Sequence, residues 1–123
     1  MPLTIEDTLK RLKQSSFRAS FHLDRRDIAY IDDKGLDVIK THAKDFISTR
    51  LKPAYIPNDG KQTPMKGHPV FKAQHACGCC CRGCLNKWYR VEMGVELTDI
   101  QVDKITNLLM AWIEKEYINY KRS

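Results

Sequence analysis

The sequence of 123 residues lacks any long hydrophobic run. A helix that crosses a bilayer needs roughly 20 consecutive apolar residues, so no membrane-spanning segment and no membrane partner is expected. The first seven residues also lack the basic stretch followed by an apolar stretch that marks a secretory signal peptide. These two absences favour the cytoplasm as the compartment.

The sequence also lacks internal repeats, low-complexity tails and blocks of five or six like charges. Its length is typical of one domain, and its 42% hydrophobic residues suffice for a core. The net charge is +6, with basic residues spread along the chain. Positive charge favours acidic partners, of which nucleic acid is the commonest, so DNA or RNA is the expected partner.

Cysteine is absent outside one short segment, because all five cysteines lie between Cys77 and Cys84. A disulfide framework ties distant parts of a chain together, with Cα atoms about 4.4–6.8 Å apart in each bond. Five crowded thiols bridge nothing distant, and their number is odd. In a reducing compartment such a cluster indicates a metal site or a reactive thiol.

The segment ends in the C-x-x-C motif Cys81-Arg82-Gly83-Cys84. Two thiolates at this spacing can bind one ion, and Arg82 is expected to offset their charge. Zinc prefers four tetrahedral sulfur or nitrogen ligands, so Zn²⁺ is the predicted cofactor. The motif supplies two ligands, Cys81 and Cys84. The candidates for the others are His75, Cys80, Cys77, Cys79 and His68.

Other thiol chemistries fit this segment less well. Iron–sulfur clusters usually space their cysteines differently. Zinc deaminases need H-x-E, but the second residue after His75 is Cys77. A thioredoxin-like site would need a βαβ pattern around it. A low-pKa cysteine beside Arg82 or His75, acting as a nucleophile, stays open as an alternative.

The hydrophobic pattern predicts a mainly α-helical single domain over residues 1–123. A helix over 5–14 begins at the cap Thr4, and a longer helix over 36–51 ends before Pro53. A capping box of Thr98 and Gln101 begins a C-terminal helix over 98–118. The alternation of apolar and polar residues in 17–23 is typical of a strand or an extended segment.

The helical N-terminal part is expected over 4–52, followed by a loop and metal segment over 53–90. Residues 52–67 form a long irregular stretch rich in proline and glycine, and such loops are usually functional or disordered. We expect an ordered loop that covers or builds the metal site. Pro69 is well placed as the first residue of a short helix running to His75, and another begins near Cys81.

The sequence resembles a known family over most of its length. The resemblance lies in the runs NDGKQTPMKGHPVF at 58–71, AQHA at 73–76 and CCRGCL at 80–85, together with much of 17–51. This bacterial and phage family is catalogued as domain of unknown function number 4186. In that family the places of Cys77 and Cys79 usually hold small or hydroxyl residues, and histidine stands in the place of Tyr89. The residues that match the family pattern are His68, His75, Cys80, Cys81 and Cys84. The resemblance therefore implies Cys81 and Cys84 as the first ligands, then His75 and Cys80, and then His68.

Three functions are compatible with these features. The first is a zinc-binding, nucleic-acid-associated protein in which basic side chains touch phosphates, namely Lys61, Lys66, Arg82 and Lys87. The second is a small metal-dependent hydrolase or nuclease, with Asp59 and His68 as candidate acid–base residues beside an open zinc position. The third is a structural zinc domain that binds another protein.

Overall fold

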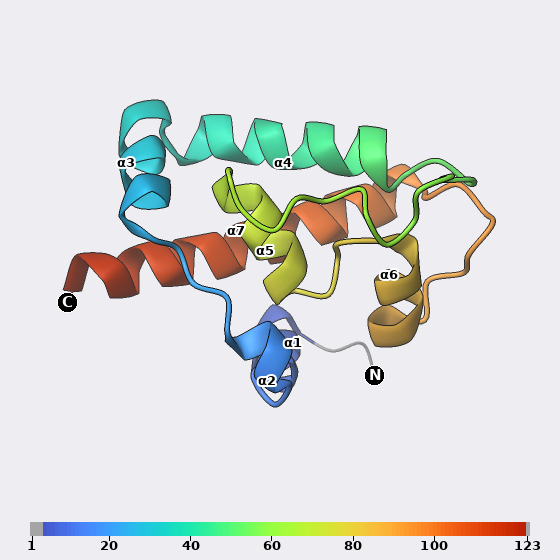
Figure 1. The fold of residues 1–123 in the computed structure, drawn as a ribbon, viewed down its shortest axis with the longest axis horizontal. Helices are drawn as coiled ribbons and strands as arrows, with labels where there is room; N and C mark the ends of the chain where they lie inside the picture. The colour runs from blue at the N-terminus through green and yellow to red at the C-terminus, as the bar shows by residue number, and fades with distance from the viewer. Residues whose placement is uncertain (1–3, 123) are drawn as a thin grey trace.

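The structure, a computed structural model, describes residues 4–122; residues 1–3 and 123 of the predicted domain lie outside the described residues. Every regular element in that range is a helix, which confirms the mainly α-helical prediction (Figure 1). No helix in 4–122 has the length and apolar character needed to cross a bilayer. The helices are α1 (Ile5–Leu12), α2 (Ser16–Ala19), α3 (Arg25–Lys34), α4 (Leu36–Arg50), α5 (Pro69–Ala76), α6 (Arg82–Tyr89) and α7 (Asp99–Arg122).

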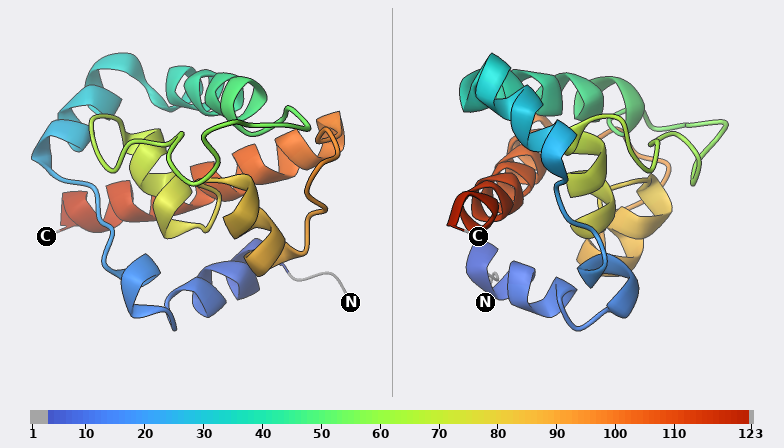
Figure 2. Two further views of the ribbon diagram at one scale, coloured as in Figure 1. Left: turned by 45° about the vertical axis from the view of Figure 1, so that its right-hand side comes forward. Right: turned by 60° about the vertical axis from the view of Figure 1, so that its left-hand side comes forward.

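Two long helices form the frame of the molecule. α4 packs along α7, and the short α5 lies against both (Figures 1 and 2). α3 turns back beside α4, while α1 and α2 lie on the side of the molecule away from α4. The apolar stripe predicted for α4 meets that of α7 in the core, where Ile39, Ile47, Leu109 and Ile113 are fully buried.

The helix ends follow local chemistry. Thr4 and Asp7 form a capping box on α1, and Thr98 and Gln101 exchange the same pair of hydrogen bonds at the start of α7. Pro69 occupies the first position of α5, where its missing N–H costs nothing. The predicted ends shift slightly, because α1 stops at Leu12 and α7 continues to Arg122.

The strand-like alternation in 17–23 proved misleading. The Ser15 hydroxyl accepts a hydrogen bond from the Arg18 N–H at 3.3 Å and caps the four-residue helix α2. Phe17 is then 51% exposed, whereas Arg18 is buried. A helix of four residues is too short to show a helical period, and its buried residue is charged. Sequence periodicity therefore pointed the wrong way over 17–19, whereas residues 21–23 are not helical and keep the alternation, with His22 exposed and Leu23 buried.

Candidate metal centre

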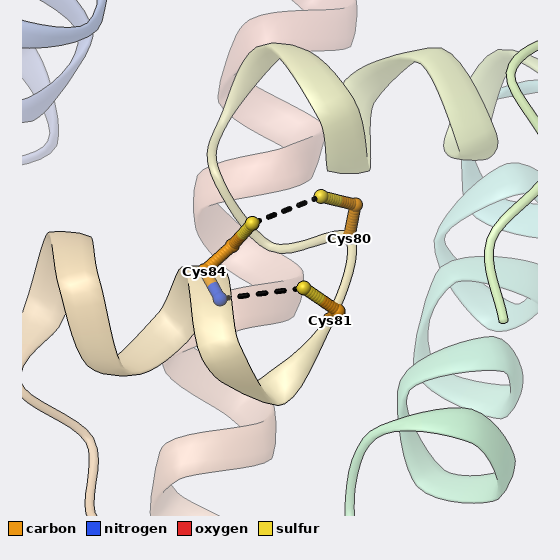
Figure 3. A group of neighbouring side chains, drawn as sticks. All are labelled: Cys80, Cys81 and Cys84. Atoms are coloured by element: carbon orange, nitrogen blue, oxygen red, sulfur yellow. Dashed lines mark hydrogen bonds between the residues drawn. The ribbon is translucent and has the colours of Figure 1, made fainter. Parts of the chain in front are cut away.

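Three of the predicted ligands meet between α5 and α6. The Sγ atoms of Cys80, Cys81 and Cys84 all lie within 4.8 Å of one another (Figure 3). The Cys80 and Cys84 sulfurs are 3.5 Å apart, and the Cys84 N–H donates to the Cys81 sulfur at 3.3 Å. The adjacent residues Cys80 and Cys81 thus both face the cluster.

The turn before α6 places these thiols. Gly78 ends α5 in a left-handed conformation with φ +70°, and a Cβ there would lie 2.8 Å from a ring carbon of Trp88. Cys81 is the N-cap of α6, with its thiol accepting from the backbone of Cys84 one turn later. Glycine at 78 therefore permits both the reversal of the chain and the close packing of Trp88.

The long loop adds a second cap to α6. The Asp59 carboxylate accepts hydrogen bonds from the N–H groups of Arg82 at 2.8 Å and Gly83 at 3.1 Å. Burial alone would raise the pKa of Asp59, but hydrogen bonds from Gln62 and those two N–H groups hold it below its ordinary value. Thr63, from the same loop, donates to the Cys80 carbonyl at 2.8 Å. The loop therefore contacts the backbone of the cysteine segment at two places, the start of α6 and the Cys80 carbonyl.

A buried arginine completes the cluster. The Arg18 guanidinium donates to the Cys84 sulfur at 3.2 Å, to the Cys80 sulfur at 3.6 Å and to the His75 carbonyl at 2.7 Å. Burial alone would lower the pKa of Arg18, but its hydrogen bonds to the two sulfurs raise it. Sequence reasoning missed this residue. Its one signal was an arginine set among the apolar residues Phe17, Ala19 and Phe21.

The remaining two cysteines belong to the hydrophobic core. Cys77 and Cys79 are both fully buried and pack with the apolar residues of the core. Burial raises the pKa of both thiols well above its ordinary value. Burial also raises the pKa of Cys81, to about 12. The Tyr89 hydroxyl donates a hydrogen bond to the Cys77 carbonyl, so Tyr89 holds the backbone of this segment.

His75 is not part of this group of close ligand atoms, and its Nε2 faces the long loop. That nitrogen lies 3.1 Å from the Thr63 carbonyl oxygen and 3.2 Å from that of Pro64. The ring stacks on Phe21, with centroids 5.4 Å apart. A neutral imidazole that donates from Nε2 keeps a lone pair on Nδ1, the atom through which His75 would bind an ion. Its role as the fourth ligand stays a prediction.

His68 caps the opposite end of α5. Its Nδ1 accepts the Val70 N–H at 3.0 Å, and its Nε2 lies 3.1 Å from Nδ1 of His42. Burial, and then the nearby His42, lower the pKa of His68 to about 4. The thiols lie beyond the C-terminal end of α5, so the structure groups His68 with His42 rather than with the cysteines.

Arg82 does not offset the charge of the motif, nor can it contact phosphate. It is only 3% exposed, and its guanidinium donates to four backbone carbonyls at 2.7–3.1 Å. Contact with phosphate needs an exposed guanidinium, and neutralising the thiolates needs one that faces the sulfurs. Arg82 has neither, so both predictions were wrong. The side chain instead ties the start of α6 to two connecting segments, through the carbonyls of Leu51, Pro53, Glu92 and Val95.

Comparison with known proteins agrees with the resemblance found in the sequence. No solved structure matches the chain. The model of one family, described as "Domain of unknown function (DUF4186)", matches residues 6–114. This range holds α1 except its first residue, all of α2 to α6, most of α7 and all of the thiol cluster. The chain therefore belongs to the DUF4186 family.

Proposed function

We propose that the protein is a zinc-binding protein in which Cys80, Cys81 and Cys84 supply three ligands. The observation that carries the proposal is the convergence of these three sulfurs within 4.8 Å. Around a tetrahedral zinc with bonds of about 2.3 Å, sulfurs lie about 3.8 Å apart, so small side-chain movements would suffice. Thiolates favour soft ions, and zinc is the commonest of these in four-coordinate sites.

The charge of the site supports a metal–thiolate centre. Three thiolates around Zn²⁺ carry one net negative charge, which is costly in a buried place. The Arg18 guanidinium contacts two of the three sulfurs and supplies one positive charge. The five free cysteines also suit a reducing compartment such as the cytoplasm.

The surroundings favour an ordering role for the ion over catalysis. The two candidate acid–base groups, Asp59 and His68, each accept backbone hydrogen bonds as caps of different helices. A capping group that gave up its backbone partners would weaken its helix. We therefore assign the ion to holding the turn between α5 and α6, with His75 as the predicted fourth ligand.

Nucleic-acid association is the second proposed function. It is supported by the net charge of +6 and by the exposure to solvent of Lys61, Lys66 and Lys87. Because Arg82 is buried, it drops out of this set. A zinc-ordered domain with free surface cations is a common arrangement for contact with phosphates.

The zinc proposal is tested by elemental analysis of the purified protein, with a free-thiol count before and after chelation. We expect about one zinc per chain and thiols that become reactive when the chelator removes it. Cys84→Ala should abolish the bound metal. The matched control Cys77→Ala, which removes a core cysteine outside the cluster, should retain it. A metal-free protein with freely reactive thiols would overturn the proposal.

A further inference from the structure

A second polar feature lies away from the thiols, where the N-terminal ends of α3 and α5 meet the end of the long loop. An open groove of about 920 Å³ runs there. We call it the basic groove. Its charged lining residues are Arg25, Arg26, Lys66, Lys72, Asp24 and Asp27, which sum to +2 (four cations minus two carboxylates).

Three of the six charges satisfy one another. Lys72 donates to Asp27 at 2.6 Å and to Asp24 at 3.1 Å. The two carboxylates also form the capping box of α3, each accepting the backbone N–H of the other residue. Lys72 and Asp27 are largely buried, so this triad is part of the fold. It leaves the remaining cations of the groove without acidic neighbours to pair with.

The other three charges have no such partner. Arg25, Arg26 and Lys66 are exposed, and none of their side chains makes a hydrogen bond or ion pair with any residue of 4–122. Arg25 and Arg26 are also the first two residues of α3. Cations are disfavoured at a helix N-terminus, because the helix dipole is positive there. Their charge thus contributes nothing to the stability of α3, while it adds to a field that attracts anions.

We propose that the basic groove binds the phosphodiester backbone of single-stranded nucleic acid, with Arg25, Arg26 and Lys66 contacting phosphates. Arginine is well suited to phosphate because its planar group donates two hydrogen bonds at once. Tyr30 lines the same groove and offers an aromatic surface to a base. This inference rests on the proposed nucleic-acid association, and it does not depend on zinc. Among the lysines assigned to phosphate above, only Lys66 belongs to the groove.

The test is fluorescence anisotropy of a labelled oligothymidylate titrated with the full chain over a series of salt concentrations. The variant Arg25→Gln/Arg26→Gln should weaken binding by at least about tenfold and reduce the slope of log K against log salt by about 1.4, or 0.7 for each lost phosphate contact. The matched control Lys10→Gln/Lys13→Gln removes the same charge from exposed positions on and just after α1. It should change affinity by less than about threefold.

The outcomes separate the groove from the wider proposal. If the wild-type chain binds the oligonucleotide but both double variants weaken it equally, attraction is diffuse and the groove is overturned. If the wild-type chain does not bind even at low salt, nucleic-acid association itself fails, and the groove with it. If inorganic triphosphate displaces the strand completely at equal phosphate concentration, the groove is a site for small polyphosphates and the assignment to a strand is overturned. Circular dichroism melting of each variant confirms that it is folded.

Discussion

The two ends of α5 bury polar groups in opposite ways. At its N-terminal end, His68 contacts His42, and aromatic rings surround the pair; we call this the imidazole end. The ring centroids of Tyr30 and Phe46 each lie 5.2 Å from that of His68. Because Nδ1 of His68 accepts the Val70 N–H, its proton is on Nε2, which donates to His42. This end is thus built for a neutral imidazole.

The C-terminal end, which we call the thiol end, is built around charge. Arg18 donates to the sulfurs of Cys80 and Cys84, Arg82 donates to four carbonyls, and ionised Asp59 caps α6. One short helix, α5, therefore separates a region that disfavours a protonated imidazole from a region that is held together by ionised side chains. Removing a guanidinium should therefore damage the thiol end, whereas acid should damage the imidazole end.

The largest effect is expected from Arg82→Met, which removes four charge-assisted hydrogen bonds from carbonyls around the thiol end. The free energy of unfolding should fall by about 3–5 kcal/mol, because buried acceptors lose their donor. Urea denaturation measures it. Lys87→Met, an exposed cation on the same helix, is the control and should change stability by less than about 0.5 kcal/mol. Equal, small losses in both variants would contradict the anchoring role of Arg82.

Acid should act on the imidazole end. The unfolded chain takes up a proton at His68 near pH 6.5, whereas burial lowers the folded pKa to about 4. The unfolded state therefore binds more protons between these values, and stability falls as pH falls from 6.5 to 4. The loss from this residue should be on the order of 2–3 kcal/mol. Urea denaturation at successive pH values measures it.

His68→Asn separates this titration from others that occur in acid. Asparagine is a good N-cap but does not titrate, so the variant should lose most of the pH slope between 6.5 and 4, whatever its absolute stability. Phe71→Leu, which loosens the same ring cluster without removing a titrating group, should keep the slope. An unchanged slope in His68→Asn would mean that the imidazole end does not exclude the proton.

Arg18→Met tests whether the positive charge at the thiol end strengthens zinc binding. Residues that hydrogen-bond to metal ligands typically contribute 10–100-fold in affinity, so we expect roughly that loss of zinc affinity, or about 1.4–2.7 kcal/mol. Competition with a chromophoric chelator measures it. Arg11→Met is the control, because Arg11 donates to the Trp88 carbonyl rather than to a sulfur. Equal affinities in the two variants would remove Arg18 from the metal centre.

The sequence predicted what local chemistry determines. Capping boxes such as Thr4 with Asp7 lie within one helical turn, and the apolar period of α4 and α7 runs over several turns, so both were visible without the fold. The C-x-x-C motif likewise belongs to one turn of α6. Three of the predicted ligands, Cys80, Cys81 and Cys84, form a group that could hold a metal ion, and the family resemblance favoured them over Cys77 and Cys79. Their role as ligands stays a prediction.

What the sequence could not predict depends on residues far apart in the chain. Arg18 lies 62 and 66 positions from the two cysteines that it contacts. Arg82 seemed a free cation because its motif is polar, but carbonyls from two separate segments enclose it. In both cases the role depends on the burial of a charged side chain. The spacing of residues in the sequence does not reveal whether a single charged residue is buried.

The smallest expected effect on stability concerns Asp59. Its two candidate roles, cap of α6 and acid–base residue, predict different results for its replacement. As the second cap of α6, it accepts two backbone N–H groups, so Asp59→Ala should lower the free energy of unfolding by about 1 kcal/mol. It should also weaken zinc binding, because the turn that holds Cys81 and Cys84 loses support. Asp59→Asn keeps one oxygen acceptor and should lose about half as much. If Asp59→Ala keeps full stability and full zinc affinity, the carboxylate is not needed as a cap, and its position beside the thiols would favour the catalytic alternative.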